Sequence, residues 1–237
     1  MKTRSAACWA RTLLGEVIDL LRRPSPRRLQ RWKALILLGL SFGKLASLRL
    51  FVEAPVHART RLEFLESAVR AASLPGLWLE FGVARGDSIN FIAAQIDPLA
   101  IHGFDSFFGL PEDWNRLFRK GAFSLQGALP AVRQNVTLHV GLFQESLPAF
   151  LLRTPGIVAF AHIDSDLYSS ASFVLDRLSD RLSRGTVLAF DEFITPSPMK
   201  NEAHAFSEFL HRTGWKYEGV ATHVGEMGDL KVAVRIR

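Results

Sequence analysis

Acidic residues recur in this sequence at the points where short apolar runs end. Four runs end in this way, at Glu80, at Asp105, at Asp164 with Asp166, and at Asp191 with Glu192. In an open parallel sheet the carboxyl ends of the strands meet at one edge, and ligands bind there. Carboxylates at such an edge can ligate a hard divalent cation or take a proton from a substrate hydroxyl. The pattern therefore predicts a ligand site lined by carboxylates.

A glycine-containing turn follows the first of these runs. Gly82 and Gly86 flank the turn between a predicted strand and the helix after it. Without a side chain, glycine lets the backbone approach a nucleotide, and the free N–H groups of a helix N-terminus favour anionic ligand groups. A dinucleotide fingerprint starting at Gly82 would need glycine where Ala84 and Asp87 stand, which disfavours a nicotinamide cofactor.

Asp105 follows Gly82 by 23 residues and ends the second predicted strand. A carboxylate in this place can accept hydrogen bonds from both ribose hydroxyls of an adenosyl group, and it can equally cap a turn or a helix. Glu80 would lie beside a ligand amine or sulfonium. Together the two residues favour S-adenosylmethionine as the ligand.

The elements that must position these residues alternate along the chain from residue 77 onward. Such alternation predicts an α/β fold with a mostly parallel sheet and helices on both faces. The predicted strands are 77–83, 100–105, 136–140, 157–164 and 186–191, followed by an antiparallel pair at the sheet edge, 215–222 and 230–236. The predicted helices are 58–72, 88–96, 169–182 and 201–213. The long connection after residue 112 is expected to be partly helical and to cover the site.

The first 50 residues carry the positive charge of the chain. They hold 11 Lys and Arg against 2 Asp and Glu, whereas the whole chain has a net charge of +6. The apolar run Ala34–Leu40 is shorter than the roughly 20 residues of a transmembrane helix. We therefore predict residues 1–57 as a basic helical segment that acts as a lid, a contact between two copies or a contact with an anionic membrane surface, or that simply packs on the domain 58–237.

Composition sets further bounds. Hydrophobic residues make up 48% of the 237 residues and charged residues 22%, which is typical of a globular protein. The single cysteine, Cys8, cannot form an intramolecular disulfide, which favours a reducing, cytoplasmic location, peripheral at the membrane if residues 1–50 bind there. Acidic Glu16 and Asp19 interrupt any early signal peptide. No nucleic acid partner is expected, because aromatic residues are not interleaved with the basic ones.

Five segments of the chain resemble the macrocin O-methyltransferase (TylF-type) family, which includes sugar O-methyltransferases of antibiotic biosynthesis. They are Leu79–Gly86 (LEFGVARG), Gly103–Glu112 (GFDSFFGLPE), Gly141–Pro148 (GLFQESLP), His162–Tyr168 (HIDSDLY) and Gly185–Glu192 (GTVLAFDE). The resemblance implies a Rossmann-like class I methyltransferase fold with a seven-stranded, mostly parallel sheet. It also implies S-adenosylmethionine as methyl donor, Mg²⁺, and a sugar-like small molecule with a hydroxyl as acceptor.

The resemblance also implies roles for individual residues. Asp164, Asp191 and Glu192 would ligate the metal, and Asp164 would be the general base. The cofactor-binding residues would be Glu80, Gly82, Val83, Ala84, Gly86, Asp87, Ser88, Asp105, Ser106 and Phe143. Two positions depart from the family pattern, because Glu192 replaces a common aspartate and Asp87 a usual glycine. Aromatic Phe107, Phe108 and Trp114 could wall the adenine or acceptor pocket.

Two alternatives stay open at this point. One is a catalytically silent methyltransferase-like binding module, motivated by the departures at Asp87 and Glu192 and by the basic segment. The other is a catechol-type O-methyltransferase, which shares the metal chemistry and differs only in having a phenol as acceptor. The fold class alone does not separate these functions. A homo-oligomer is also compatible with the sequence.

Overall fold

The computed structural model describes residues 54–195, 199–226 and 228–237. The predicted basic segment 1–57 therefore lies outside the described residues except for its last four positions, and so does Cys8. Within the described ranges, no helix combines the length and the apolar character needed to cross a membrane.

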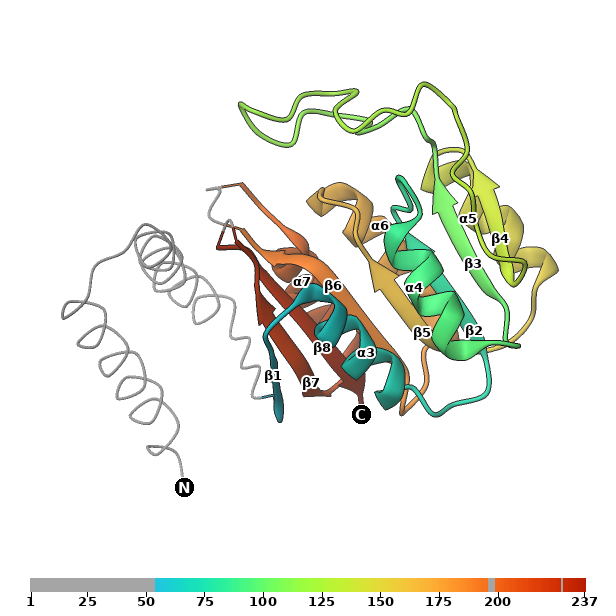
Figure 1. The fold of residues 1–237 in the computed structure, drawn as a ribbon. Helices are drawn as coiled ribbons and strands as arrows, with labels where there is room; N and C mark the ends of the chain where they lie inside the picture. Colours follow the sequence, from blue (N-terminus) through green and yellow to red (C-terminus); the bar gives the residue numbers. More distant parts are fainter. Residues whose placement is uncertain (1–53, 196–198, 227) are drawn as a thin grey trace.

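An eight-stranded sheet forms the centre of the structure, in the order β1-β7-β8-β6-β5-β2-β3-β4 (Figure 1). The strands are β1 (Val56–Ala58), β2 (Leu77–Phe81), β3 (Ile101–Asp105), β4 (Val136–Val140), β5 (Val158–Ile163), β6 (Val187–Ile194), β7 (Tyr217–Val224) and β8 (Leu230–Ile236). Strand β8 runs antiparallel to both of its neighbours, and all other pairs are parallel. The predicted α/β class with an antiparallel C-terminal pair is confirmed.

The sheet has one strand more than the seven predicted. Strand β1 pairs in parallel with β7, so the C-terminal hairpin does not form the outer edge of the sheet. Only three residues belong to β1, and none of them is fully buried. Three residues are too few for an alternating apolar pattern to predict a strand.

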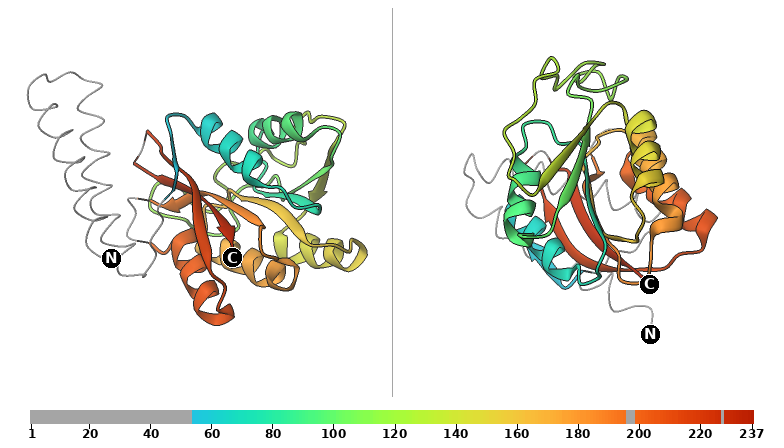
Figure 2. Two further views of the ribbon diagram at one scale, coloured as in Figure 1. Left: turned by 90° about the horizontal axis from the view of Figure 1, so that it is seen from below. Right: turned by 90° about the vertical axis from the view of Figure 1, so that its right-hand side faces the viewer.

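Helices cover both faces of the sheet, as Figure 2 shows. They are α3 (Arg61–Ala71) and α4 (Asp87–Ile96) on one face, and α5 (Phe143–Arg153), α6 (Tyr168–Leu178) and α7 (Glu202–Thr213) on the other, with a short 3₁₀ turn η1 (Ser179–Arg181) after α6. Helix α5 was not predicted, because Pro148 lies inside it. Proline lacks the N–H that an interior helical position donates, and it usually indicates a helix end.

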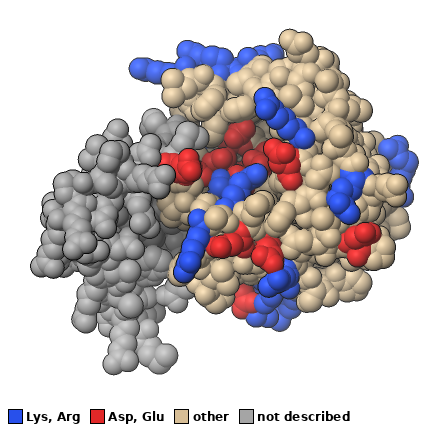
Figure 3. All heavy atoms as spheres, in the orientation of Figure 1, with Lys and Arg blue, Asp and Glu red and all other residues tan. Residues whose placement is uncertain are grey.

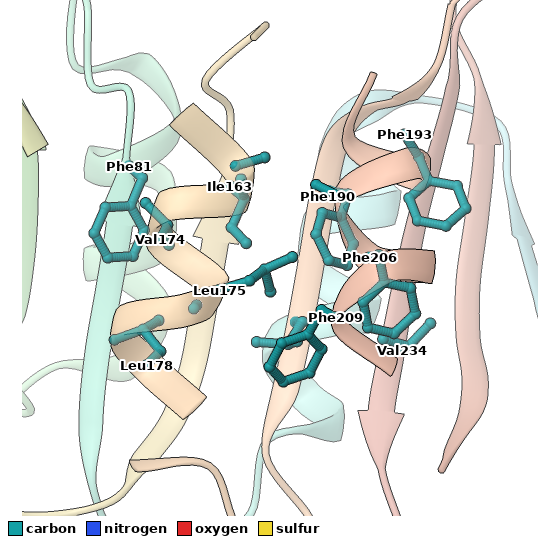
Figure 4. Packing of buried hydrophobic residues seen from close by; sticks show 14 of the residues in the cluster. Phe81, Ile163, Val174, Leu175, Leu178, Phe190, Phe193, Phe206, Phe209 and Val234 are labelled. Carbon is teal, nitrogen blue, oxygen red and sulfur yellow. The ribbon is translucent and has the colours of Figure 1, made fainter. Parts of the chain in front are cut away.

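Each face of the sheet has its own apolar core. Apolar side chains of α5, α6 and α7 pack on one face and those of α3 and α4 on the other. Figure 4 shows the first of these cores, where the Phe190 ring of β6 meets the Phe206 ring of α7 with centroids 5.2 Å apart. Burying one such side chain contributes roughly 1.5–3 kcal/mol. The two cores hold the strand ends, and hence the carboxylates on them, in fixed positions.

The connection between β3 and β4 contains no helix, so the expectation that it is partly helical was wrong. Its backbone takes left-handed conformations at Gly109, Gly121, Phe123 and Gln126, which an α-helix does not tolerate. The side chain of Asn115 accepts hydrogen bonds from backbone N–H groups of the next turn. These local hydrogen bonds compete with helix formation.

Candidate active site

Two cavities open where the predicted site lies, at the carboxyl ends of the central parallel strands. The first has a volume of about 360 Å³ and the second about 320 Å³. Ala84, Phe123, Leu125 and Asp164 line both cavities, so the two adjoin. Figure 3 shows acidic side chains gathered in a hollow on this face of the molecule. The β3–β4 connection does cover this region, since Leu110, Trp114 and Phe118 from it line the first cavity.

The glycine turn has the backbone shape that the sequence predicted. Gly82 has φ +90°, and a Cβ added there would lie 1.9 Å from the backbone oxygen of Asp164. Gly86 is the N-cap of α4, with φ +84° and no side-chain capping hydrogen bond. The first N–H groups of α4 thus lack a capping side chain, which suits an anionic ligand group.

Asp105 holds this turn together. Its Oδ2 accepts hydrogen bonds from the backbone N–H groups of Val83 at 2.9 Å and Ala84 at 2.8 Å, and its Oδ1 accepts one from Phe107 at 2.7 Å. Asp105 therefore caps the turn, which is one of the two roles that its place in the sequence allows. A carboxylate has about four acceptor positions, and Asp105 also lines the first cavity. It retains capacity for a ligand hydroxyl.

Glu80 is placed differently from the expectation that it lies beside a ligand amine. It is fully buried and accepts a hydrogen bond from Ser88 Oγ at 2.9 Å, and its Oε2 lies 3.2 Å from His162 Nδ1. It lines neither cavity. Glu80 lies behind the glycine turn and ties β2 to α4 and β5.

The remaining predicted cofactor residues divide between the two cavities. The first cavity is lined by Gly82, Ala84, Asp105, Ser106 and Phe143, and the second by Val83, Ala84, Asp87 and Ser88. Gly86 lines neither. Of the loop aromatics, Phe107 and Trp114 line the first cavity, whereas Phe108 is exposed. The structure thus gathers most of this set around adjoining spaces.

Three carboxylates converge in the first cavity. Asp164, Asp166 and Glu192 line it, and each offers one oxygen within 4.8 Å of the others. Burial, together with the neighbouring carboxylates, raises the pKa of Asp164 to about 7 and that of Asp166 to about 8. The pKa of Glu192 is also raised, mainly by burial. Three hard oxygen donors that repel one another fit a bound divalent cation.

Asp191 is held in a different environment. Its Oδ1 accepts a hydrogen bond from Arg61 Nε at 2.8 Å and lies 3.4 Å from His162 Nε2, and its Oδ2 accepts one from Lys231 Nζ at 2.7 Å. Burial opposes ionisation, but the hydrogen bond with His162 and the charges of Lys231 and Arg61 hold the pKa of Asp191 far below its usual range. Asp191 lines neither cavity.

The structure therefore does not bring the predicted metal ligands Asp164, Asp191 and Glu192 into one group. Asp164 belongs to two acidic groups, one with His162 and Asp191 and one with Asp166 and Glu192. Asp191 and Glu192 are neighbours in β6, where the pairing with β8 is irregular, and both lie near Lys231 Nζ, Asp191 Oδ2 at 2.7 Å and Glu192 Oε1 at 3.8 Å.

The sequence analysis did not predict two cations that lie beside the carboxylates, Arg61 and Lys231. Arg61, the first residue of α3, donates hydrogen bonds to Asp164 at 2.6 Å and to Asp191. Its partners lie more than 100 positions away, so no local pattern indicates the contact. Lys231 did have a signal, since it stands inside the apolar run of β8 and is only 6% exposed. A lysine in a buried strand is rare unless it is paired.

Comparisons with known proteins agree with this architecture. Residues 79–193 match the family model described as a methyltransferase domain. The 8-demethyl-8-(2,3-dimethoxy-alpha-L-rhamnosyl)-tetracenomycin-C 4'-O-methyltransferase of Streptomyces olivaceus is 30% identical over 158 residues, which are 56% of this chain and 58% of that protein. The chain thus spans less than two thirds of this relative.

Solved structures of methyltransferases are similar in fold. CalS11, described as a calicheamicin methyltransferase, has a TM-score of 0.62 and 25% identity, covering 90% of this chain and 94% of its own. The O-methyltransferase NovP has a TM-score of 0.53 and 21% identity, covering 87% and 98%. The chain therefore has the Rossmann-like fold of S-adenosylmethionine-dependent methyltransferases, with a methyltransferase domain matched over residues 79–193.

Proposed function

We propose that this protein is an S-adenosylmethionine-dependent O-methyltransferase of the TylF type that acts on a hydroxyl of a sugar or of a glycosylated small molecule. One observation carries the proposal. Asp164 lines both cavities, so it lies beside the residues of the glycine turn, where the donor would bind, and beside the carboxylates Asp166 and Glu192 of the first cavity. A base between donor and acceptor is what in-line methyl transfer to a hydroxyl requires.

The chain's own residues would bind the donor around the glycine turn. S-adenosylmethionine, when bound, supplies an electrophilic methyl group. Asp105 would accept a ribose hydroxyl, and Phe143 beyond β4 lines the same cavity and can contact the adenine. Arg85 lines the second cavity beside the start of α4 and can receive a carboxylate. Together these residues would fix the donor's position.

Asp164 would take the proton of the acceptor hydroxyl. Burial and nearby carboxylates raise its pKa to about 7, which is suited to proton transfer near neutral pH. Arg61 donates a hydrogen bond to Asp164 Oδ2 and fixes the orientation of the carboxylate. A divalent cation at the carboxylates of the first cavity would polarise the hydroxyl and lower its pKa.

A sugar-like acceptor is supported by the tetracenomycin relative, which is described as the 4'-O-methyltransferase of a rhamnosyl-tetracenomycin. The first cavity adds a physical argument, because Trp114 and Phe118 stack there with ring centroids 5.4 Å apart. Aromatic faces beside carboxylates suit a ligand with both apolar and hydroxyl surfaces. Residues 1–57 remain predicted as a lid or as a contact with another copy or a membrane.

Calorimetric titration of S-adenosylmethionine and of S-adenosylhomocysteine, with and without Mg²⁺, tests the donor. The wild type should bind both ligands, and Asp105→Ala should weaken binding by roughly 10-fold or more, since a charge-assisted hydrogen bond is worth about 1.5–3 kcal/mol. Because Asp105 also caps the turn, Asp105→Asn and the exposed control Asp180→Asn are measured alongside, with circular dichroism to verify folding. If neither ligand binds, the proposal is wrong and a silent binding module replaces it.

A variant of the proposed base, Asp164, tests the methyl transfer reaction itself. Asp164→Asn should retain S-adenosylhomocysteine binding and lower the rate of transfer by roughly 10²–10⁴, the usual contribution of a general base. Rhamnosylated and phenolic acceptors are compared in the same assay. Transfer to phenols alone would replace the sugar acceptor by a phenol, and full activity of Asp164→Asn would rule out Asp164 as the base.

A further inference from the structure

We propose that the tip of the β3–β4 connection, residues 114–120, docks on an anionic membrane surface. Such docking goes beyond the proposed methyl transfer, because the tip would contribute a surface and not a reacting group. The tip belongs to the described part of the chain, whereas nearly all of the basic segment 1–57 lies outside it. The charge of the connection, its exposed apolar side chains and the closed turn at its tip each fit a membrane surface.

The β3–β4 connection is strongly basic. Residues 114–135 contain four basic residues and no acidic one. The four are Arg116, Arg119, Lys120 and Arg133, and all of them are exposed. Among the described residues, only Arg119 of these four forms an ion pair, with Asp113 at 2.6 Å. Figure 3 shows Lys and Arg side chains gathered along the top of the molecule, where Figure 1 places this connection. Their positive charge faces solvent, so an anionic surface would attract it.

Apolar side chains of the same connection also face water. Leu117 at the tip is 85% exposed, and Phe123 and Leu129 are each more than half exposed. A single exposed apolar side chain is common in soluble proteins, but these three share one connection with the four basic residues. A soluble anion would account for the basic side chains and leave Leu117 in water. Apolar side chains among basic ones are typical of segments that lie at the surface of an anionic membrane.

The tip is a closed turn with Arg116 and Leu117 at its apex. The N–H groups of Trp114 and Asn115 donate hydrogen bonds to the backbone oxygen of Phe118, at 3.0 and 3.2 Å. The Asn115 side chain accepts hydrogen bonds from the N–H groups of Leu117 and Phe118. At the base of the turn, Trp114 is buried in a small apolar cluster that includes the N-cap residue of α6. A hydrogen-bonded turn therefore holds the Leu117 side chain in water, and a lipid surface would cover it.

A row of aromatic rings joins the tip to the first cavity. The rings of Trp114 and Phe118 stack with centroids 5.4 Å apart, and those of Phe118 and Phe123 lie 5.0 Å apart. All three side chains line the first cavity. Because Phe123 is also more than half exposed, the row extends from the cavity to the surface of the connection. If the proposed function holds, docking would bring this row next to lipid, from which an acceptor with an apolar part could enter the cavity.

Co-sedimentation of the full chain with lipid vesicles tests the docking. The vesicles contain phosphatidylcholine alone or phosphatidylcholine mixed with the anionic lipid phosphatidylglycerol. The wild type should bind the mixed vesicles more tightly, and high salt should weaken this binding. Arg116→Gln/Lys120→Gln should weaken it by roughly 10- to 30-fold, because each basic residue near anionic lipid contributes about 5-fold. Leu117→Ser should weaken it by roughly 10-fold, since it removes an apolar side chain from the lipid surface.

Matched control residues lie at the opposite edge of the sheet. Leu152 near the end of α5 is 88% exposed, and Arg153 and Arg184 are exposed near the starts of β5 and β6. Leu152→Ser and Arg153→Gln/Arg184→Gln make the same chemical changes as the tip variants, and both should bind vesicles as the wild type does. None of the residues changed in the tip or control variants lines either cavity. Circular dichroism and S-adenosylhomocysteine binding should therefore be the same in all variants.

An environment-sensitive fluorophore distinguishes docking of the tip from binding through residues 1–57. In a Cys8→Ser chain, the fluorophore is attached at Leu117→Cys or, as the control, at Leu152→Cys. On mixed vesicles its emission should shift to shorter wavelength at Leu117→Cys only.

The proposal is overturned if the fluorophore at Leu117→Cys shows no shift, if it shifts equally at Leu152→Cys, or if the tip variants bind vesicles as tightly as the controls. It is also overturned if the emission at Leu117→Cys shifts with rising protein concentration in the absence of vesicles, which would make the tip a contact between two copies. All these outcomes leave the cofactor titration, and with it the proposed methyltransferase activity, unaffected.

Discussion

Lys231 of β8 and Asp191 of β6 form a buried ion pair, with Nζ 2.7 Å from Oδ2 and side chains only 7% and 5% exposed. The two strands are antiparallel neighbours, so the pair joins the C-terminal hairpin to the carboxylate edge of the parallel strands. Since both charges are removed from water, each depends on the other.

Removing one member of this pair should be strongly destabilising. We expect Lys231→Met to lower the free energy of unfolding by about 3–5 kcal/mol, because it removes the positive charge that pairs with the two buried carboxylates Asp191 and Asp229. Lys200→Met is the control, since its ion pair with Glu208 is exposed and should contribute less than about 1 kcal/mol. Urea denaturation measures both. Equal losses for the two variants would contradict the importance of burial.

The pair His102 and His139, with Nδ1 and Nε2 3.1 Å apart on β3 and β4, should make stability depend on pH. Burial, the partner histidine and Arg153 lower the pKa of His139 to about 4, and burial lowers that of His102. The unfolded chain, with a histidine pKa of about 6.5, then binds more protons than the folded one. Stability from this pair is complete above pH 6.5 or so and is lost as the pH falls towards 4.

Variants can separate the pH dependence of stability that comes from His102 and His139 from the pH dependence that comes from the acidic residues. Denaturation curves at several pH values are compared for the wild type, His139→Gln and the exposed helix residue His211→Gln. The loss of stability below pH 6.5 should shrink in His139→Gln only. An unchanged pH profile in that variant would show that His139 titrates normally.

Gly82→Ala should damage both folding and cofactor binding. The added Cβ would meet the backbone oxygen of Asp164 at 1.9 Å, and backbone cannot move aside cheaply. Gly214→Ala is the matched control, because Gly214 also has positive φ, +74°, but nothing lies within 4 Å of the added atom. The control should cost about 1–2 kcal/mol, whereas Gly82→Ala should cost clearly more. Thermal unfolding measures the loss of stability, and titration with S-adenosylhomocysteine measures the loss of cofactor binding.

Glu202 should tolerate glutamine but not alanine. Burial and the carboxylates around it raise the pKa of Glu202 well above its ordinary value, which favours the neutral form of the side chain. Glutamine is also neutral and keeps a carbonyl acceptor, and Glu202→Gln should change stability by less than about 1 kcal/mol. Glu202→Ala leaves the N–H groups of Ser165 and Glu192 without this acceptor and should cost about 1–3 kcal/mol or more. A large loss in Glu202→Gln would indicate that the carboxylate is ionised.

Elements with a local signature were predictable from the sequence. The strand over 136–140 and the helix that follows Asn201 appear with nearly the expected bounds, because apolar periodicity and capping chemistry act within a few residues. Helix α5 was missed because Pro148 is tolerated inside it. Edge strand β1 was missed because its formation depends on β7, far along the chain.

The candidate site likewise has features that local sequence predicts and features that depend on distant residues. That acidic residues would meet at one edge could be predicted, since the strand order of a parallel sheet brings carboxyl ends together. Which of them would pair with basic side chains could not be predicted, because the partners of Asp191, Arg61 and Lys231, come from α3 and β8. Glu80 shows the same effect, since Ser88 and His162 hold it inside the protein.

Strand β1 ends at Ala58, and Arg61 follows after two residues. The outermost strand of the sheet and the guanidinium on Asp164 therefore belong to one short stretch of chain. Were Arg61 to leave the carboxylate, the pKa of Asp164 would rise, because the positive charge of Arg61 lowers it. The residue that lowers the proton affinity of Asp164 therefore comes from the short stretch of chain that links the edge strand β1 to helix α3.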